Sequence, residues 1–235
     1  MAGLSQRAAA IRERIGDACA RVGRDPSGVQ LLAVSKTVAA ETLRAAVAAG
    51  LTVFGENRVQ EAAAKAPLVP GARWHLVGHL QSNKARTALE VFETIESVDS
   101  LELALRLDRL LADEPPPDRD GSGRRGVLLQ VNVDADAAKT GFAPAGLEAA
   151  LRELAALPHL RLAGLMTVGR LGAAPEEARP TFVALRGISE RLRDHEPRLG
   201  AALSMGMSDD FAVAVEEGAT IVRVGRALFG ERPPA

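Results

Sequence analysis

Tyrosine is missing from this sequence, and aromatic residues as a group make up only 3% of its 235 residues. Any chemistry that needs a tyrosine side chain as its acid or base is therefore excluded for this chain. Cysteine is nearly missing as well, since Cys19 is the only one. One cysteine cannot form an intrachain disulfide, and its rarity is typical of a reducing compartment. Cys19 lies in a helical pattern, so we expect it to be a buried packing residue.

Long hydrophobic runs and an excess of one charge are also missing. No apolar stretch approaches the roughly 20 residues that a membrane-spanning helix needs. The formal net charge is -1, with acidic and basic residues interspersed, so nothing indicates a nucleic-acid or membrane partner. The first 20 residues carry arginines, as mitochondrial presequences do, but Glu13 and Asp17 argue against a presequence. We expect a cytoplasmic protein.

Short β-like runs alternate with longer helical stretches after a leading helix over about residues 5–22. The runs predicted as strands are 30–37, 52–57, 73–78, 94–99, 127–133, 162–168, 202–208 and 221–224, and helical periodicity is clear over 40–49, 59–66 and 101–111. Strict alternation predicts a parallel sheet. Eight units in a chain of this length predict one closed (β/α)8 TIM barrel over residues 1–235, with an open doubly wound sheet as the alternative. Residues 113–126, rich in proline and glycine, are predicted to form a flexible loop.

Two familiar motifs do not fit their structural context. Residues 121–126 match G-x-G-x-x-G, but a dinucleotide-binding loop follows a strand, whereas this segment precedes one. His75 and His79 have the spacing of a helical zinc site, but a strand would hold them about 13 Å apart. No cysteine or carboxylate cluster completes such a site. We therefore expect neither a dinucleotide site nor a zinc site.

Lys36 closes an apolar run and is predicted to share a strand face with Leu32 and Val34. An ammonium group directed at a core is costly unless it is paired or neutralised. A neutral lysine amine in a dry pocket is also a good nucleophile for carbonyl compounds. This segment alone favours a lysine that extends to water. Its place at the carboxyl end of a predicted barrel strand changes that expectation, because the active sites of such barrels lie at the carboxyl ends of their strands.

The ends of the last two predicted strands indicate a phosphate site. Barrels often bind phosphate in these loops through backbone N–H groups. The first of these strands ends in the segment 203–210, which offers the hydroxyls of Ser204 and Ser208 and the glycine Gly206, and the second ends in Gly225 and Arg226. The alternative is that Ser208 and Asp209 only cap the helix that follows.

Arg223 shares a predicted strand face with Ile221 and Gly225 and should point inward. A buried guanidinium needs a partner, which could be a carboxylate such as Glu56 or a ligand acceptor such as a pyridine nitrogen. An inward lysine, an inward arginine and a phosphate cradle together fit pyridoxal 5′-phosphate (PLP).

Several segments resemble the pyridoxal 5′-phosphate homeostasis protein family, whose members are barrels similar to the N-terminal domain of alanine racemases. The matching segments are Ala33-Val34-Ser35-Lys36-Thr37, Phe54-Gly55-Glu56-Asn57, Val59-Gln60-Glu61, Trp74-His75, Leu80-Gln81-Ser82-Asn83-Lys84, Gln130-Val131-Asn132, Gly164-Leu165-Met166, Leu203-Ser204-Met205-Gly206-Met207-Ser208, Val222-Arg223-Val224-Gly225 and Phe229-Gly230-Glu231-Arg232. The resemblance runs from about residue 31 to residue 232.

The resemblance implies a role for each site residue. Lys36 would form the internal aldimine with PLP, and Arg223 would face the pyridine nitrogen. The residues implied at the phosphate are Ser204, Gly206, Met207, Ser208 and Gly225, with Asn57 and Met166 beside the ring. Arg58, His79 and Arg226 depart from the family pattern, and Arg226 leaves only a backbone N–H where a small hydroxyl residue is common. Lys139 lies in a segment like the family's Lys-Ser-Gly, and we expect it to be a solvated loop lysine.

Two classes of function compete for such a site. Alanine-racemase-like chemistry needs a lysine and a tyrosine on opposite faces of the ring, and this chain has no tyrosine and no length left for the extra β-domain. An arginine at the pyridine nitrogen also makes the ring a poorer electron sink. We therefore expect a carrier that stores PLP or delivers it to apo PLP-dependent enzymes, and the resemblance implies a monomer. A racemase or decarboxylase, with His79 as second base, and an aldolase that uses Lys36 without a cofactor are the alternatives.

Overall fold

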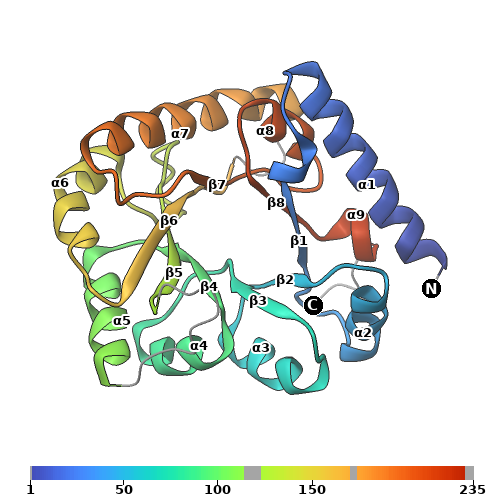
Figure 1. Ribbon diagram of the computed structural model, residues 1–235, viewed down its shortest axis with the longest axis horizontal. Coiled ribbons are helices and arrows are strands. Elements are labelled where there is room, and N and C mark those ends of the chain that lie inside the picture. The colour runs from blue at the N-terminus through green and yellow to red at the C-terminus, as the bar shows by residue number, and fades with distance from the viewer. Residues whose placement is uncertain (1, 114–122, 170–173, 231–235) are drawn as a thin grey trace.

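Eight parallel strands close into a barrel in which each strand pairs with the next along the chain, and β8 pairs back with β1. This computed structural model describes residues 2–113, 123–169 and 174–230. Figure 1 shows the helices arranged around the outside of the strands. The predicted (β/α)8 barrel is confirmed, and the open sheet is wrong because β1 and β8 are paired along their length.

The strands are β1 (Gln30–Val34), β2 (Val53–Glu56), β3 (Arg73–Leu76), β4 (Thr94–Val98), β5 (Arg125–Gln130), β6 (Leu160–Met166), β7 (Ala202–Ser204) and β8 (Ile221–Val224). The α-helices are α1 (Ala2–Arg21), α2 (Ala40–Ala48), α3 (Val59–Lys65), α4 (Ala85–Val91), α5 (Leu101–Asp113), α6 (Pro144–Ala155), α7 (Pro175–His195), α8 (Phe211–Glu216) and α9 (Arg226–Phe229). Short 3-10 turns follow at Pro26–Gly28, Ala66–Leu68 and Ser82–Lys84.

Seven of the eight strands end earlier than the hydrophobic pattern predicts. β1 ends at Val34 rather than at residue 37, and β7 ends at Ser204 rather than at residue 208. After β1, the Ser35 N–H still donates to the Gly55 carbonyl at 2.9 Å, but Thr37 has a φ of 64° and turns the chain away. Lys36, Asn57 and residues 206–208 therefore lie beyond the strand ends at the carboxyl-terminal mouth of the barrel, where backbone groups are released from the sheet, whereas Met166, Ser204 and Arg223 remain in strands.

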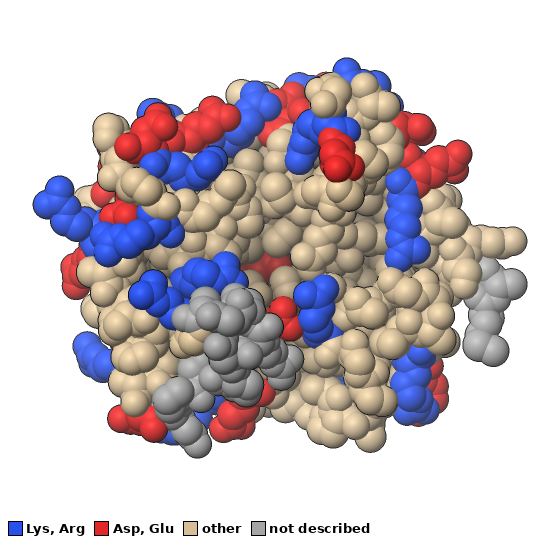
Figure 2. Space-filling view, viewed as in Figure 1, with Lys and Arg blue, Asp and Glu red and all other residues tan. Residues whose placement is uncertain are grey.

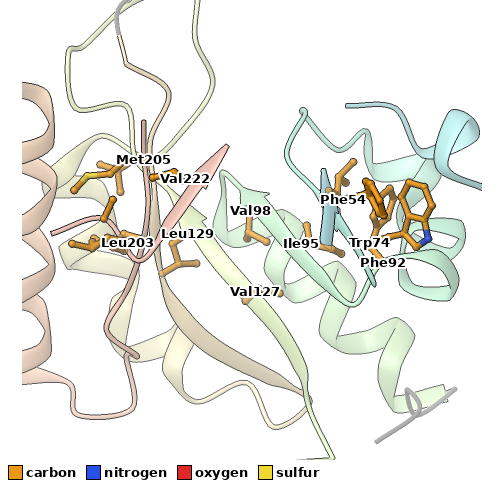
Figure 3. Close-up of a cluster of buried hydrophobic side chains, with 14 of the residues drawn as sticks. Phe54, Trp74, Phe92, Ile95, Val98, Val127, Leu129, Leu203, Met205 and Val222 are labelled. Carbon is orange, nitrogen blue, oxygen red and sulfur yellow. The ribbon is translucent and has the colours of Figure 1, made fainter. Parts of the chain in front are cut away.

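The apolar residues of the strands form two layers because both faces of a parallel sheet are covered. Side chains that point outward pack beneath the helices, and Figure 3 shows part of this layer, including Phe54, Trp74, Ile95, Leu129 and Val222. The interior of the barrel holds a smaller apolar cluster made of Leu32, Val53, Leu128, Met166 and Ile221. Leu32 is paired with Arg223 and Met166 with Ser204, so this inner apolar cluster lies beside the polar residues described next.

Helix α1 lies outside the ring and packs against α8 and α9 (Figure 1). Its apolar face is buried, and Cys19 is fully buried in it, as predicted. In the part of the chain that the structure describes, no helix is long and apolar enough to cross a membrane. The predicted flexible loop falls mostly on residues 114–122, which lie outside the described residues, and its last two residues instead begin β5.

Candidate functional site

Lys36 and Asn57 are brought to the same level of the barrel mouth by the register of β1 and β2. Val34 is paired with Gly55, and Lys36 and Asn57 each lie two residues further along, just beyond the ends of β1 and β2. Lys36 is half-buried. Among residues 2–113, 123–169 and 174–230, no side chain or carbonyl forms a hydrogen bond or ion pair with its amine. The amine is thus available to a ligand.

Glu56, one of the two alternatives considered as partner of Arg223, bonds to other residues. Glu56 is fully buried, and its Oε1 accepts hydrogen bonds from Ser35 Oγ at 2.7 Å and from Lys65 Nζ at 2.8 Å. Burial raises the pKa of Glu56, and the bonds from Lys65 and Ser35 oppose that rise. Because Glu56 points away from the barrel interior toward Lys65 of α3, the alternative in which it pairs with Arg223 is wrong.

Arg223 is held instead by groups inside the barrel. Its Nη1 donates to Ser204 Oγ at 2.7 Å, and its Nη2 donates to the Thr167 carbonyl at 2.7 Å. Ser204 Oγ donates in turn to Glu96 Oε2 at 2.5 Å, and Glu96 Oε1 lies 2.6 Å from His75 Nδ1. This chain of polar side chains, here called the inner network, links β3, β4, β7 and β8 across the barrel.

The inner network compensates for the burial of its charges. Burial alone would raise the pKa of Glu96, but the hydrogen bond and charge of His75 and the charge of Arg223 outweigh it and lower that pKa. Burial lowers the pKa of Arg223, while the charges of Glu96 and Asp210 oppose this. These charges and hydrogen bonds leave Arg223 buried with a fixed orientation.

Figure 2 shows a hollow in the middle of one face of the molecule, with acidic atoms visible in its depth.

The loop after β7 is built around a glycine. Gly206 has a φ of 89°, and a Cβ there would lie 2.5 Å from the Ala214 Cβ, so glycine is required both by conformation and by space. The next residue, Met207, donates its N–H to Asp210 Oδ1 at 2.6 Å. Burial raises the pKa of Asp210, and the bond from the Met207 N–H opposes that rise. Asp210 therefore fixes the loop that contains the predicted phosphate residues.

The loop after β8 lies against the loop after β7. The Gly225 N–H points at Ser208 Oγ at 3.4 Å, and the exposed Arg226 guanidinium pairs with Asp209. The backbone N–H groups of Ser208 and Arg226 meet no acceptor within the described part of the chain. Two free N–H donors on adjoining loops are suited to bind an anion.

The remaining predicted residues occupy different layers. Met166 is fully buried in the inner apolar cluster. The backbone of Asn57 is packed so closely against Gly78 that a Cβ at Gly78 would lie 2.3 Å from the Asn57 carbonyl oxygen. His79 is exposed at the mouth, and its Nδ1 lies 2.9 Å from Asp99 Oδ2.

The expectation of a solvated loop lysine at position 139 is wrong. The Lys139 side chain is only 15% exposed. Its Nζ lies 3.2 Å from the Val168 carbonyl and 3.1 Å from the Gly169 carbonyl. Asn132 bonds to the backbone of Asp136 and Lys139 and so fixes the loop 132–141, and Lys139 Nζ also lies 3.4 Å from Asp136 Oδ2.

Sequence reasoning missed the groups that hold Lys36 and Arg223 in place. Glu96 lies in the middle of the buried strand β4. Charged residues are rarely buried without a partner, so its position was the signal that could have indicated the inner network. Glu61 and Lys65 have the i,i+4 spacing of a helical ion pair, but the sequence did not show that this pair meets the turn after β1.

The chain matches the family model described as alanine racemase, N-terminal domain, over residues 7–233. It is 43% identical to the pyridoxal phosphate homeostasis protein of Pseudomonas aeruginosa, with 99% of this chain and 97% of that protein covered. The protein of the same name from Escherichia coli K12 is 39% identical, with 95% and 94% covered. This chain belongs to the pyridoxal phosphate homeostasis protein family. The resemblance seen in the sequence is thereby confirmed.

Solved structures of family members support the same fold. PipY of Synechococcus elongatus, without PLP, superposes with a TM-score of 0.84 at 42% identity and covers 97% of this chain and 100% of its own. The PLP-bound form of PipY gives a TM-score of 0.83 at the same identity and coverage. An alanine racemase of Clostridium difficile is 16% identical with a TM-score of 0.75, and this chain covers 57% of it. That distant likeness shows the fold alone.

Proposed function

We propose that this protein binds PLP at the carboxyl-terminal mouth of the barrel and holds it for use by other proteins. The observation that carries the proposal is the Lys36 amine, which is half-buried at the mouth and has no partner among the described residues. The PLP-bound form of a relative that is 42% identical supports the choice of ligand, as do the names of the curated relatives.

The donors at the mouth fit the groups of PLP. PLP supplies an aldehyde, a pyridine nitrogen and a phosphate. The aldehyde matches the free amine of Lys36, and the phosphate matches the free N–H groups of Ser208 and Arg226. The nitrogen atom of Lys36 would bond to the aldehyde carbon, and the aldehyde oxygen would leave as water, which gives a Schiff base.

The hydrogen bonds of Ser204 change the role that we assign to it. Ser204 is fully buried, and its hydroxyl is shared between Glu96 and Arg223. We therefore assign Ser204 to hold Arg223 rather than to bind phosphate directly. Gly206, Met207, Ser208, Gly225 and the backbone of Arg226 form the proposed phosphate loops.

The ring of PLP would be bordered by three residues. Arg223 would face the pyridine nitrogen, and because its guanidinium stays charged, it would not supply a proton to that nitrogen. Asn57 and Met166 would lie beside the ring. A ring without a proton on its nitrogen stabilises carbanions poorly, which favours storage or delivery over turnover.

The test of PLP binding is covalent trapping. The purified protein is mixed with PLP, its visible absorption spectrum is recorded, and borohydride reduction is followed by peptide mapping. We expect an imine absorption band and a reduced adduct on Lys36. The Lys36→Ala variant should lose both, and Lys84→Ala, which removes a lysine of another loop, should keep both. An adduct on a different lysine, or no band, overturns the proposal.

The test of the carrier role separates holding from turnover. The PLP-loaded protein is incubated with a panel of L-amino acids, and in a second experiment with an apo PLP-dependent enzyme. We expect less than one product per protein molecule in the first experiment and activation of the apo enzyme in the second. Multiple turnovers of racemised or decarboxylated product would make the protein an enzyme.

A further inference from the structure

The turn that carries Lys36 is held from outside the barrel by a second lysine. Lys65, the last residue of α3, donates from its Nζ to the Ser35 carbonyl at 2.8 Å. The same Nζ lies 2.6 Å from Glu61 Oε1, and that oxygen accepts the Thr37 N–H at 2.5 Å. The backbone is therefore fixed on both sides of Lys36, directly at Ser35 and through Glu61 at Thr37.

This arrangement holds a conformation that the chain would otherwise avoid. Thr37 has a φ of 64° although it is not glycine, and a β-branched residue in the left-handed region is strained. Such a conformation persists only when its surroundings impose it. The contact from Glu61 to the Thr37 N–H is one of the bonds that impose it, and Lys65 orients Glu61.

The cation of Lys65 also stabilises a buried acid. Glu56 is fully buried, and its Oε2 has no hydrogen-bond partner among the described residues. Its Oε1 receives both Ser35 Oγ and Lys65 Nζ. The Lys65 side chain is itself only 12% exposed. Glu56, Glu61 and Lys65 are here called the outer cluster. Their hydrogen bonds are largely shielded from solvent, so the cluster is part of the folded structure and not a set of surface charges.

We propose that Lys65 is a positioning residue for Lys36. Its three hydrogen bonds fix the turn Ser35–Thr37 in the conformation that presents the Lys36 amine at the barrel mouth. Lys65 lies on the α3 side of the barrel wall and does not touch the ligand itself. This inference rests on the proposed role of Lys36, and it adds a requirement to it: the nucleophilic lysine is effective only while the second lysine holds its backbone.

The test compares Lys65→Met with Lys65→Arg. PLP binding is followed by the imine absorption band during titration, and amide hydrogen exchange is followed at residues 35–38 in the protein without PLP. We expect Lys65→Met to bind PLP roughly ten-fold more weakly and to exchange the Thr37 amide faster. Lys65→Arg, which keeps a cation and several donors, should restore most of the affinity.

The matched control is Arg179→Met. Arg179 bonds to Glu176, Glu216 and Glu217 on the other side of the barrel, so its loss also removes a cation shared among carboxylates. The control should lower the thermal stability without changing PLP affinity or exchange at Thr37. If Lys65→Met folds and keeps the affinity and the exchange rate of the wild-type protein, the inference is wrong.

A milder variant covers the case in which Lys65→Met does not fold. Glu61→Gln keeps Lys65 but weakens the acceptor of the Thr37 N–H, and we expect a few-fold loss of affinity with faster exchange at Thr37. Unchanged affinity and exchange in this variant also contradict the inference. The hydrogen-exchange measurement needs no PLP. If Lys36 fails to form an adduct with PLP, the proposed function is overturned, but the effect of Lys65 on the turn Ser35–Thr37 can still be measured.

Discussion

The two cationic residues proposed to face PLP are supported in opposite ways. Arg223 is held by its own side chain, which bonds to Ser204 and Thr167 within the inner network. Lys36 is held by its backbone, through the outer cluster, and its side chain has no partner in the described part of the structure. This difference has a chemical reason. A side chain that is to react with a ligand must keep its reactive atom free of other partners, so the protein holds the backbone of that residue instead.

The largest expected effect comes from removing the arginine. Arg223→Leu should lower the free energy of unfolding by about 3–5 kcal/mol, because it leaves Glu96 buried without that cation. Urea denaturation at neutral pH measures the loss. The control is Arg226→Leu, which removes an exposed ion pair and should cost less than about 1 kcal/mol. Equal losses in the two variants would contradict the comparison.

The loop after β7 should be the next most sensitive part. Asp210→Ala removes the acceptor of the Met207 N–H and should lower the free energy of unfolding by about 1–2 kcal/mol. Because the proposed phosphate loop loses the carboxylate that fixes it, PLP affinity should also fall several-fold. Asp209→Ala, which removes only the exposed pair with Arg226, serves as the control in both measurements. If PLP titration gives the same affinity for both variants, Asp210 does not fix the loop.

Glu96 of the inner network and Glu56 of the outer cluster should contribute to the pH dependence of stability with opposite signs. The pKa of Glu96 is lowered in the folded protein, so ionised Glu96 adds stability above its unfolded pKa, and this is lost as the pH falls through the folded pKa. The pKa of Glu56 is raised, so its contribution is complete below the unfolded pKa and is lost as the pH rises through the folded pKa.

Two amide variants measure this difference between Glu96 and Glu56. As the pH rises from about 3 to about 7, the stability advantage of the wild-type protein over Glu96→Gln should grow, and its advantage over Glu56→Gln should shrink. Urea denaturation of the three proteins at several pH values gives both trends. Parallel trends would mean that the two carboxyl groups do not have opposite environments.

The smallest effect on stability is expected at the residue with the largest proposed role. Lys36→Ala should change the free energy of unfolding by less than about 0.5 kcal/mol in the absence of PLP, because its amine has no partner to lose. Thermal unfolding of the apo protein measures it. A loss of about 2 kcal/mol or more would show that the amine is engaged, and the contrast with Arg223 would then be wrong.

The sequence predicted most of the fold because strand and helix periodicities are local properties. The eight strands, the leading helix and buried Cys19 all follow from apolar patterning. The strand ends did not follow, since apolar residues such as Val133 and Val168 continue the pattern after the ladder has ended. Where a parallel strand stops depends on its neighbours and on the turn that follows, and both are set in three dimensions.

The candidate site was predictable in part for a similar reason. Residues near the carboxyl ends of barrel strands meet at one mouth, so Lys36, Arg223 and the loops at 206–208 and 225–226 could be placed together from topology alone. The partner of Arg223 was not found from the sequence, because Glu56 was considered and Glu96, which reaches Arg223 through Ser204, was overlooked. Their opposite faces decided the matter, and the register of the closed barrel fixes those faces.

By itself, the sequence determined a parallel barrel, a lysine at a strand end and the absence of tyrosine, because composition and periodicity are written in the chain. Only the tertiary structure decided which charges meet. Glu96 reaches Ser204 across 108 residues, and Lys65 reaches Ser35 across 30. Buried charges are tolerated only with partners at hydrogen-bond distance, and such distances exist only once the barrel has closed.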